Sequence, residues 1–373
     1  ASDPDFSVVL FEDFLFLLYA EVQRARALGP DKLAVWLAPG LLEAFPRDAE
    51  LQEVRGIVIG ALRVVSFSGM TPQGVTLELE VEANYSEVSR DGRERRYYVF
   101  DRLTVGRGPA GRSRPFARAS ILDCPNCGAP TEGLRGTQCT YCRQEVGGGR
   151  LDWLVVGMQN LSKETRGPLL TSDVAEQGTA LPTVADPGGQ SRWLALQSRD
   201  PSVTWEGLMA RVQLIFAELQ AGWSNRDAAR IRPWVSDNLM QSMSYWLELY
   251  QQRHCRNVTE KTQILDIVPA NVLSDAHFDA VTVRLTASGL DYTLGDDGKL
   301  LSGSKSRPRT YSEYWTLIRG SQHQGPARTE LVCPGCGAPL RIGMAGHCEY
   351  CRAKVTSGQF DWVLSRIEIG RAS

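Results

Sequence analysis

Apolar residues recur at helical spacing in two parts of the chain. Between residues 205 and 225, five of them fall three or four positions apart or side by side on one face: Leu208, Val212, Ile215, Phe216 and Leu219. A second apolar stretch, from Phe6 to Ala20, is interrupted by Glu12-Asp13. Both patterns predict amphipathic helices with one buried face. Ser224 and Asp227 have the spacing of a capping box for a further helix.

Alternating apolar and polar residues follow each helical region. The apolar positions of the two runs are Val75, Leu77, Leu79, Val81 and Ala83, and Val281, Val283, Leu285 and Ala287. This period of two predicts half-buried antiparallel strands. We predict a further strand from Tyr97 to Arg107 and from Tyr311 to Arg319, and a last one beginning at Asp152-Trp153 and at Asp361-Trp362. Helices followed by strands predict an α+β fold.

Eight of the nine cysteines form two clusters with identical internal spacing. The clusters are Cys124, Cys127, Cys139 and Cys142, and Cys333, Cys336, Cys348 and Cys351. In each cluster, two residues separate the members of a pair and eleven separate the pairs. Two such turns facing each other complete the tetrahedron of thiolates that binds Zn²⁺. We therefore predict two four-cysteine zinc sites, each holding a short ribbon.

The residues around the ligands fit this interpretation. Gly128 and Gly337 follow the first pair of each cluster and can take positive φ without steric cost. We expect Arg143 and Arg352, which follow the last ligands, to offset the negative charge of the thiolates. Four protein ligands close a zinc site, so both metals are expected to be structural.

Other interpretations of the cysteines and their neighbours stay open. Disulfides and iron–sulfur ligation are the alternatives to zinc, although paired turns of this kind favour a metal over a disulfide framework. His347, beside Cys348, is either a loop residue or a fifth ligand. Cys255 is expected to be a small buried apolar residue.

Matches outside the cysteines indicate an internal duplication. Asp3-Pro4 matches Asp200-Pro201 at an offset of 197 residues, Trp36 matches Trp234 at 198, and Asp152-Trp153 matches Asp361-Trp362 at 209. Small changes of offset are the loop insertions expected between related domains. The chain is thus predicted to hold two tandem domains, over residues 1–159 and 200–373, each with its ribbon before the last strand, at about 120–150 and 329–359.

Residues 160–199 are predicted to be a linker. The segment is rich in Gly, Pro, Ser and Thr and lacks sustained periodicity. The apolar residues of this segment either dock on the domains or belong to a flexible tether, and both interpretations stay open. These residues are Leu169, Leu170, Leu181, Val184, Trp193 and Leu196.

Composition sets outer limits on function. The chain of 373 residues is 43% hydrophobic and 23% charged, as in ordinary soluble proteins. Its net charge of −2 supplies no overall basic field for nucleic acid. No stretch approaches the roughly 20 apolar residues of a membrane span. Because the chain starts at Ala1 without methionine, we expect that a targeting or anchoring segment could precede it.

The detailed motifs resemble a known family. Helices followed by a curved antiparallel sheet are similar to the nuclear-transport-factor-two-like cone, and the sequence resembles bacterial members of the family named for the forty-four-kilodalton subunit of the mitochondrial inner-membrane translocase. The residues that carry the resemblance are 214–220, 223–227, Asp291-Tyr292, 313–319, 333–339 and 360–362. The second repeat fits from Trp205 to Ile369, and the first is more divergent.

The resemblance implies a binding protein near a membrane. It implies two cone-like domains with apolar cavities, a membrane anchor upstream of Ala1, and a location at the bacterial inner membrane with the domains on the cytoplasmic side. Our leading hypothesis is a noncatalytic zinc-containing scaffold that recruits or tethers a protein or lipid partner through cone cavities or ribbon surfaces.

Two other function classes provide alternatives. A nucleic-acid-binding ribbon would use a basic run before the first cluster, which holds Phe116 and five arginines: Arg102, Arg107, Arg112, Arg114 and Arg118. A small-molecule enzyme would place polar residues in a cone pocket, and the candidates are Asp101, Asp291, Tyr292 and His254. We expect neither nucleic-acid binding nor catalysis, because no spacing among these residues is diagnostic.

Overall fold

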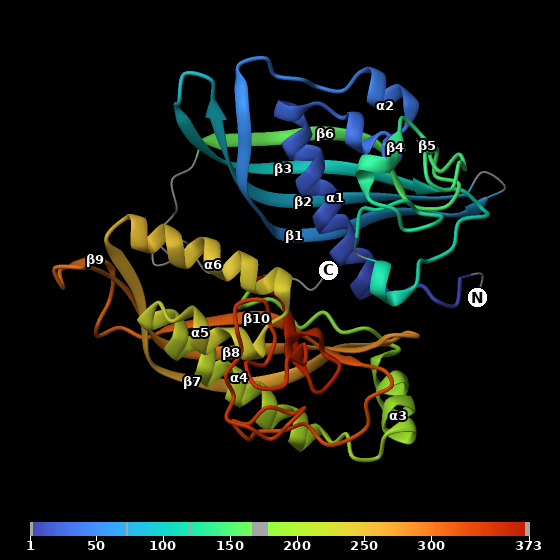
Figure 1. The fold of residues 1–373 in the computed structure, drawn as a ribbon. Helices are drawn as coiled ribbons and strands as arrows, with labels where there is room; N and C mark the ends of the chain where they lie inside the picture. Colours follow the sequence, from blue (N-terminus) through green and yellow to red (C-terminus); the bar gives the residue numbers. More distant parts are fainter. Residues whose placement is uncertain (1–2, 72–73, 120, 166–177, 370–373) are drawn as a thin grey trace. The chain divides into compact units, whose positions relative to one another are not determined.

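The computed structural model describes residues 3–71, 74–119, 121–165 and 178–369, which form two compact units (Figure 1). The boundary between the units lies within 166–177. In each unit a helical region precedes an antiparallel sheet, and a cysteine cluster lies between the third long strand and the last. The fold is therefore α+β, as predicted. Leu169 and Leu170 lie outside the described residues.

The first unit opens with a long buried helix. Helix α1 spans Val8–Leu28, and the Ser7 hydroxyl caps it by accepting from the Leu10 amide at 3.4 Å. The helix ends at Gly29, whose φ of 89° suits a residue without a side chain. Two short helices follow, η1 at Asp31–Leu33 and α2 at Pro39–Glu43. The predicted amphipathic helix is confirmed, and among the described residues no helix combines the length and apolarity of a membrane span.

Four antiparallel strands form the first sheet in the order β1-β2-β3-β6. They span Leu51–Thr71 (β1), Gly74–Ser89 (β2), Glu94–Arg107 (β3) and Leu154–Thr165 (β6). In β2 the apolar residues from Leu77 to Ala83 are buried at every second position, as predicted. Helix α1 packs against β1, and its Leu15, Leu18 and Val22 join the sheet residues in one core. Between β3 and β6 lie η2 (Phe116–Arg118), η3 (Thr131–Gly133), β4 (Leu134–Arg135) and β5 (Gln138–Cys139).

Helices again come first in the second unit. They are α3 (Gly189–Arg199), α4 (Trp205–Asn225), α5 (Ala228–Ile231), η5 (Arg232–Trp234) and α6 (Asp237–Gln252). The apolar face predicted from Leu208 to Leu219 is buried on α4. Both α4 and α6 pack against β7 (Cys255–Ser274).

The second sheet repeats the strand order of the first. Strands β7, β8 (Phe278–Gly295), β10 (Arg309–Gly320) and β11 (Val363–Ile369) pair antiparallel in that order, and β9 (Leu300–Gly303) adds to β8. A short helix, η6 (Val355–Ser357), precedes β11. Val281, Val283, Leu285 and Ala287 of β8 are fully buried in the core of this unit. The predicted strands around residues 97–107, 281–287 and 311–319 are therefore confirmed.

Strands β1 and β7 are longer than any predicted strand, yet the hydrophobic pattern did not reveal them. Both contain several register shifts against their neighbours, and each has a residue at positive φ, Gly56 at 59° and Lys261 at 51°. Because each bulge moves the following side chains to the other face, the period of two is lost along the sequence.

The predicted capping box of Ser224 and Asp227 differs from the structure. Ser224 does not cap a helix, because α4 continues through Asn225 and ends at Arg226, which has a φ of 55°. Its hydroxyl instead accepts from the Thr259 amide at 2.9 Å. Asp227 is itself the cap of α5, since its carboxylate accepts from the Arg230 amide at 3.0 Å.

Two of the described parts of 160–199 carry regular structure, and residues 178–188 between them form turns and irregular chain. Strand β6 continues to Thr165 along β3, and α3 occupies Gly189–Arg199. Leu196 and Trp193 pack on the core of the second unit, whereas Leu181 and Val184 are exposed. The content of Gly, Pro, Ser and Thr led to the prediction of a linker, although this segment contains the end of a strand and a helix that are stabilised by neighbouring elements.

Replacing Leu285 by alanine should destabilise the second unit by about 2–5 kcal/mol, because a fully buried leucine leaves a cavity. Leu301→Ala, at a leucine that is 49% exposed on β9, is the matched control and should change stability by no more than about 0.5 kcal/mol. Urea denaturation followed by tryptophan fluorescence measures both. Equal effects of the two substitutions would contradict the placement of the core.

Candidate metal centres

The structure brings together the four sulfurs of each predicted cluster. All Sγ atoms within a cluster lie within 4.8 Å of one another. Cys124 and Cys142 are 3.9 Å apart, Cys127 and Cys139 3.8 Å, and Cys333 and Cys351 3.8 Å. Tetrahedral Zn–S bonds of about 2.3 Å give sulfur separations of roughly 3.8 Å. All nine cysteines are free thiols, so the geometry fits a metal ion and not a disulfide pair.

The same tight turn shapes each of the four cysteine pairs. In the first pair, the Cys124 amide donates to Ala129 at 2.8 Å and the Gly128 amide donates to Cys124 at 2.9 Å. The last pair repeats this pattern, from Cys348 to Ala353 and from Arg352 to Cys348. The residue after the second cysteine always has positive φ: Gly128 (77°), Arg143 (59°), Gly337 (74°) and Arg352 (61°).

This turn gives the two arginines a backbone role that sequence reasoning missed. Their side chains are exposed, and their main chains occupy the left-handed conformation that glycine supplies in the other turns. The predicted offset of thiolate charge stays a prediction. The sequence does contain a sign of this backbone role, because Arg143 and Arg352 follow their cysteine pairs at the same position as Gly128 and Gly337.

Hydrogen bonds and burial shift the thiol pKa values of the first cluster in opposite directions. Hydrogen bonds from the Asn126 side chain and the Gln144 amide lower the pKa of Cys142 to about 6. Burial raises the pKa of Cys124 to about 12. The lowered pKa favours the thiolate form of Cys142, the form that ligates metals.

Two further residues near the cysteines have clear positions. His347 is exposed and lies outside the four-sulfur cluster, so the structure gives no support to its interpretation as a fifth ligand. Cys255 is 1% exposed at the start of β7, which confirms the prediction that it is buried.

The two ribbons attach differently to their units. Cys124, Cys139 and Val146 belong to the main core of the first unit. In the second unit Cys333, Cys348, Ile342 and Val355 form a small core of their own. Its principal polar bridge to the helices is Arg232, which is 1% exposed.

The guanidinium of Arg232 holds three parts of the second unit together. Its Nε donates to the Met344 carbonyl at 2.7 Å, and its Nη1 donates to the Val235 carbonyl at 2.8 Å. Its Nη2 donates to Thr356 Oγ1 at 3.1 Å and pairs with Asp237. Charge-assisted hydrogen bonds thus join the second ribbon to η5 and α6, in addition to Leu340, which packs against both the small core and the main core of the unit.

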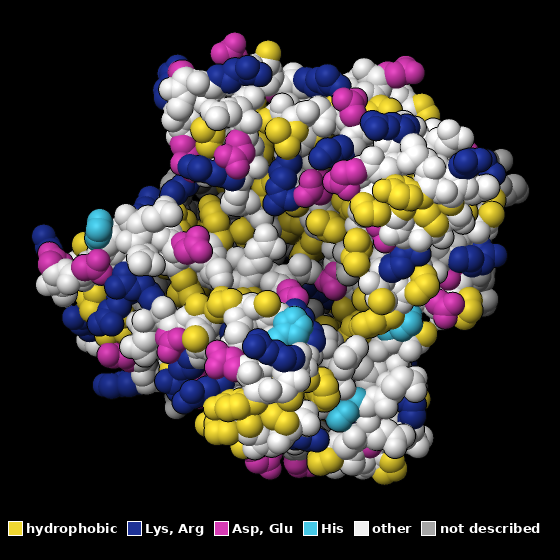
Figure 2. All heavy atoms as spheres, viewed as in Figure 1, with side chains coloured by type: hydrophobic (Ala, Val, Ile, Leu, Met, Phe, Trp, Pro, Cys, Tyr) yellow, Lys and Arg dark blue, Asp and Glu magenta, His cyan; other side chains and the backbone are white. Residues whose placement is uncertain are grey.

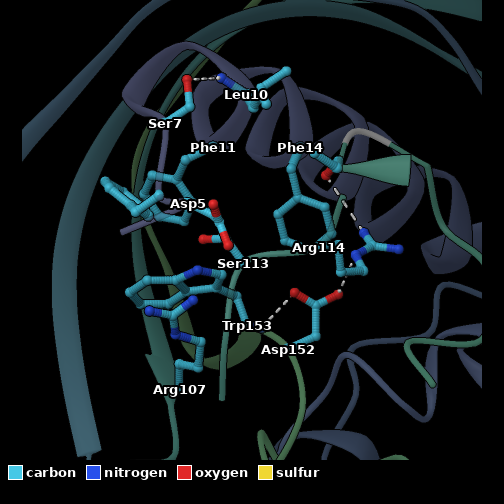
Figure 3. A pocket seen from close by; sticks show the side chains of 12 residues that line it. Asp5, Ser7, Leu10, Phe11, Phe14, Arg107, Ser113, Arg114, Asp152 and Trp153 are labelled. Atoms are coloured by element: carbon cyan, nitrogen blue, oxygen red, sulfur yellow. Dashed lines mark hydrogen bonds and ion pairs between the residues drawn. The ribbon is translucent and has the colours of Figure 1, made fainter. Parts of the chain in front are cut away.

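A partly buried arginine clamps the base of the first ribbon (Figure 3). Arg107, at the end of β3, pairs with Asp3 at 2.7 Å and lies over the Trp153 ring at 4.8 Å. The Trp153 amide donates to the Asp152 carboxylate at 2.9 Å. The clamp therefore joins the start of the unit to both strands that flank the ribbon.

Matched residues form the same clamp in the second unit. Arg319, at the end of β10, pairs with Asp200 at 3.0 Å and lies 4.9 Å from the Trp362 ring centre. The Trp362 amide donates to Asp361 at 2.7 Å. Burial alone would raise the pKa of Asp200, but hydrogen bonds from Ser202, Gly325 and Arg319 outweigh it and hold the pKa below its ordinary value.

The aspartate before each tryptophan takes its arginine from a different element. Asp152 pairs at 3.2 Å with Arg114, from the segment after β3, and the Arg114 guanidinium lies 5.5 Å from the Phe14 ring centre. Asp361 pairs at 3.5 Å with Arg211, which stands on α4 at the position matched to Phe14. In both units the aspartate before the tryptophan is thus paired with a buried arginine, but the two arginines lie on different elements. Burial raises the pKa of Asp152 and lowers that of Arg211.

Small cavities adjoin these ion pairs. The cavity in the first unit has a volume of about 30 Å³ and is lined in part by Arg114, Asp152 and Phe14 (Figure 3). The cavity in the second unit has a volume of about 20 Å³ and is lined in part by Arg211 and Asp361. Such volumes hold one or two water molecules. The apolar ligand cavity that the resemblance implies does not correspond to either space.

The four candidate catalytic residues do not converge. Asp101 is buried under α1, where it accepts hydrogen bonds from Tyr19 at 2.6 Å, Gln23 at 3.1 Å and Asn160 at 2.7 Å. It belongs to the first unit, whereas the other three candidates belong to the second. The Asp101 carboxylate is therefore engaged in holding α1 on its sheet.

In the second unit the remaining candidates face different surroundings. Asp291 accepts from Asn257 at 2.7 Å and pairs with Arg309 at 3.2 Å. Tyr292, the next residue on β8, is 4% exposed in a small apolar cluster. His254 has a side chain that is 86% exposed and lies on a turn with a φ of 52°. None of the four lines either cavity.

The basic run before the first cluster is occupied by internal contacts. The partners are Glu80 for Arg102, Asp3 for Arg107, the Pro109 and Gly111 carbonyls for Arg112, Asp123 and Asp152 for Arg114, and Asp123 for Arg118. On the face shown in Figure 2, basic and acidic side chains are interspersed. Four of the five arginines are thus paired with carboxylates, which reduces the charge that the run offers to phosphate.

Asp200→Asn should lower stability at neutral pH and flatten its dependence on acid. Because the pKa of Asp200 is lowered in the folded chain, its contribution is present above about pH 4, the ordinary aspartate pKa, and is lost as the pH falls through the folded value. Urea denaturation at pH 7 and pH 3 should show a difference from the wild type that shrinks in acid. Glu206→Gln, at an exposed carboxylate on α4, should leave the profile unchanged, and a constant difference for Asp200→Asn would contradict the argument.

Arg352→Gly should retain metal binding and raise the free energy of unfolding by up to about 1 kcal/mol, because glycine adopts positive φ without the steric cost of a side chain. Arg352→Val removes the same charge and should destabilise the ribbon, because a β-branched residue is strained there. Competition with a chromophoric chelator and urea denaturation measure the two effects. Equal loss of metal affinity in both variants would show that metal binding depends on the charge of Arg352 and not on its backbone conformation.

The whole chain was compared with known proteins, and the family match lies within the second unit. No curated protein matches the chain. The model of the Tim44-like domain matches residues 192–327, which run from α3 past the end of β10 and stop before the second cysteine cluster. This match supports the relationship to the Tim44 family that the motifs of the second repeat indicate.

Proposed function

We propose that this protein is a noncatalytic, zinc-containing scaffold built from two Tim44-like cone domains, one over residues 1–159 and one over 200–373. The observation that carries the proposal is the Tim44-like match over 192–327, in a chain with two closed four-cysteine sites. Domains of that family serve translocases as binding partners, so recruitment of other proteins is the function that fits best.

Matched contacts support a tandem architecture. Both sheets have the same strand order, and both clamps join an N-terminal aspartate, an arginine and a tryptophan. The Ala38 amide donates to Val155 at 2.9 Å, as the Ser236 amide does to Leu364 at 2.9 Å. Corresponding contacts between corresponding residues are what a duplicated domain retains, because they stabilise the shared fold.

The chemistry of the ligands supports zinc and a structural role. Four thiolates in a tetrahedron suit Zn²⁺ and leave no open position for water or substrate. When bound, the metal would supply the cross-link that a ribbon of some thirty residues needs in order to fold. The eight cysteines would hold it, Cys124, Cys127, Cys139 and Cys142 in one ribbon and Cys333, Cys336, Cys348 and Cys351 in the other.

The ribbons present the surface for a protein partner in this proposal. Tyr141 and Tyr350 occupy the same position, immediately before the last ligand, and they are 67% and 52% exposed. Leu331 and Met344 add exposed apolar side chains to the second ribbon. Aromatic residues exposed on a rigid support are typical anchors of protein interfaces. The partner is proposed to be a protein at the cytoplasmic side of a bacterial inner membrane.

The full chain should carry two zinc ions, and Cys333→Ser should carry one, because three thiolates do not close the second site. Elemental analysis of the purified proteins measures this content. Cys333→Ser should also lose sedimentation with inner-membrane vesicles, since the unfolded ribbon no longer presents Tyr350 and Met344. Cys255→Ser, at the cysteine outside both clusters, is the control and should keep both metals and full binding.

Two outcomes would refute parts of this proposal. Vesicle binding that survives removal of the metals would exclude the ribbons as the contact surface. Undiminished binding to protease-treated vesicles or to vesicles of lipid alone would identify lipid, and not a protein, as the partner.

A further inference from the structure

The two cysteine clusters differ in how many of their ligands face solvent. In the first cluster, Cys124 and Cys139 belong to the main core of the unit, and Cys142 packs against that core. The fourth ligand, Cys127, is exposed. An oxidant in solution therefore meets one exposed ligand in this cluster.

The second cluster presents two exposed ligands, Cys336 and Cys351. Its other two ligands, Cys333 and Cys348, are 1% and 0% exposed and belong to the small core of the ribbon. All four sulfurs lie within 4.8 Å of one another. Two thiols that are both accessible and adjacent can be joined by one molecule of oxidant, because the first to react has a resolving partner within reach.

The contacts of Arg232 allow the second ribbon to open without stranding a buried charge. Its guanidinium reaches the ribbon through the Met344 carbonyl and the Thr356 hydroxyl. Its other partners, the Val235 carbonyl and the Asp237 carboxylate, belong to the helical region and stay in place when the ribbon opens. The large cost of a buried cation without a carboxylate therefore does not hold the ribbon closed.

Opening of the first ribbon, by contrast, would disrupt the core of its unit. Cys124, Cys139 and Val146 share that core with helix α1 and the first sheet. The second ribbon touches the main core of its unit through Leu340, which is partly buried. Because its opening exposes less of the main core, the second ribbon should open at a lower free energy than the first.

We propose that Cys336 and Cys351 form a site of reversible oxidation by peroxides, in which a disulfide replaces the bound metal. One thiolate attacks a peroxide oxygen, the O–O bond breaks, and a sulfenic acid and a hydroxide ion result. The second thiolate attacks the sulfenic sulfur, forms the S–S bond and expels a second hydroxide ion. Two thiolates are thus oxidised while one molecule of hydrogen peroxide is reduced to two hydroxide ions.

Oxidation at this site would dismantle one surface of the proposed scaffold. The disulfide uses two ligands, and the remaining pair, Cys333 and Cys348, does not close a zinc site. The ribbon that carries Tyr350 and Met344 then loses its fold. A dithiol reduces the disulfide to two thiols and becomes a disulfide itself, so the ligands are restored. This inference rests on the zinc sites and the ribbon surface of the proposed function.

Hydrogen peroxide added to the full chain with both zinc sites filled tests the proposal. A chromophoric chelator should record one zinc ion leaving at least about tenfold faster than the other, because the second ribbon opens without its unit. Mass spectrometry after alkylation should find Cys336 joined to Cys351 while the first cluster is still reduced. Hydrogen exchange should accelerate in the second ribbon and stay slow in β8 and β10. A dithiol added with zinc should restore the metal content.

Two variants identify the source of each zinc ion. Cys333→Ser, which breaks the second site, should lose the fast release and keep the slow one. Cys255→Ser, at the buried cysteine outside both clusters, should keep both. The proposal is overturned if both zinc ions leave at the same rate, if the first cluster is oxidised first, or if exchange accelerates throughout the second sheet.

Elemental analysis before oxidation separates this inference from the proposed function. Absence of zinc from the untreated chain would refute the metal sites and the oxidation site together. A chain that holds two zinc ions and resists peroxide at both clusters would overturn the oxidation site alone.

Discussion

The pairing of an arginine with an aspartate and a tryptophan at the base of the ribbon is the constraint on which each unit depends. Arg107 and Arg319 stand at the ends of β3 and β10, where the chain leaves the sheet for the ribbon, and Trp153 and Trp362 stand where it returns. A buried guanidinium without its carboxylate would carry a large desolvation cost. The clamp therefore requires the first residues of the unit and both flanking strands to meet at one point.

The cysteine clusters solve a second problem that this arrangement creates. A segment of some thirty residues between two strands buries little apolar surface of its own, and a metal bound by the four thiolates would supply the missing cross-link. The two ribbons show that such a module can be joined to its unit in different ways. The first shares the core through Cys124 and Cys139, whereas the second relies on the hydrogen bonds of Arg232. The second ribbon is the more separable of the two.

In the described residues, the buried charged side chains hold helices and segments in place through hydrogen bonds and ion pairs. Asp101 holds α1 through Tyr19 and Gln23, and Asp361 holds Arg211 across the second core. Arg284 holds the turn at residues 178–181 through main-chain carbonyls. The polar residues that would have been candidates for catalysis or phosphate binding have internal partners instead.

Sequence patterns alone determined the parts of this protein that local rules control. The period of α4, the alternation in β2 and β8, and the cysteine spacing each follow from one element or one ligand geometry. Tertiary structure decided what depends on residues far apart in the chain. Bulges hid β1 and β7, and the left-handed conformation of Arg143 and Arg352 arises in a closed turn. The partners of Asp101 came from α1 and β6, and Arg102 and Arg107 found theirs in Glu80 and Asp3. A single sequence shows which residues carry charge, but only the packed chain brings each charge to its partner, because burial makes pairing obligatory.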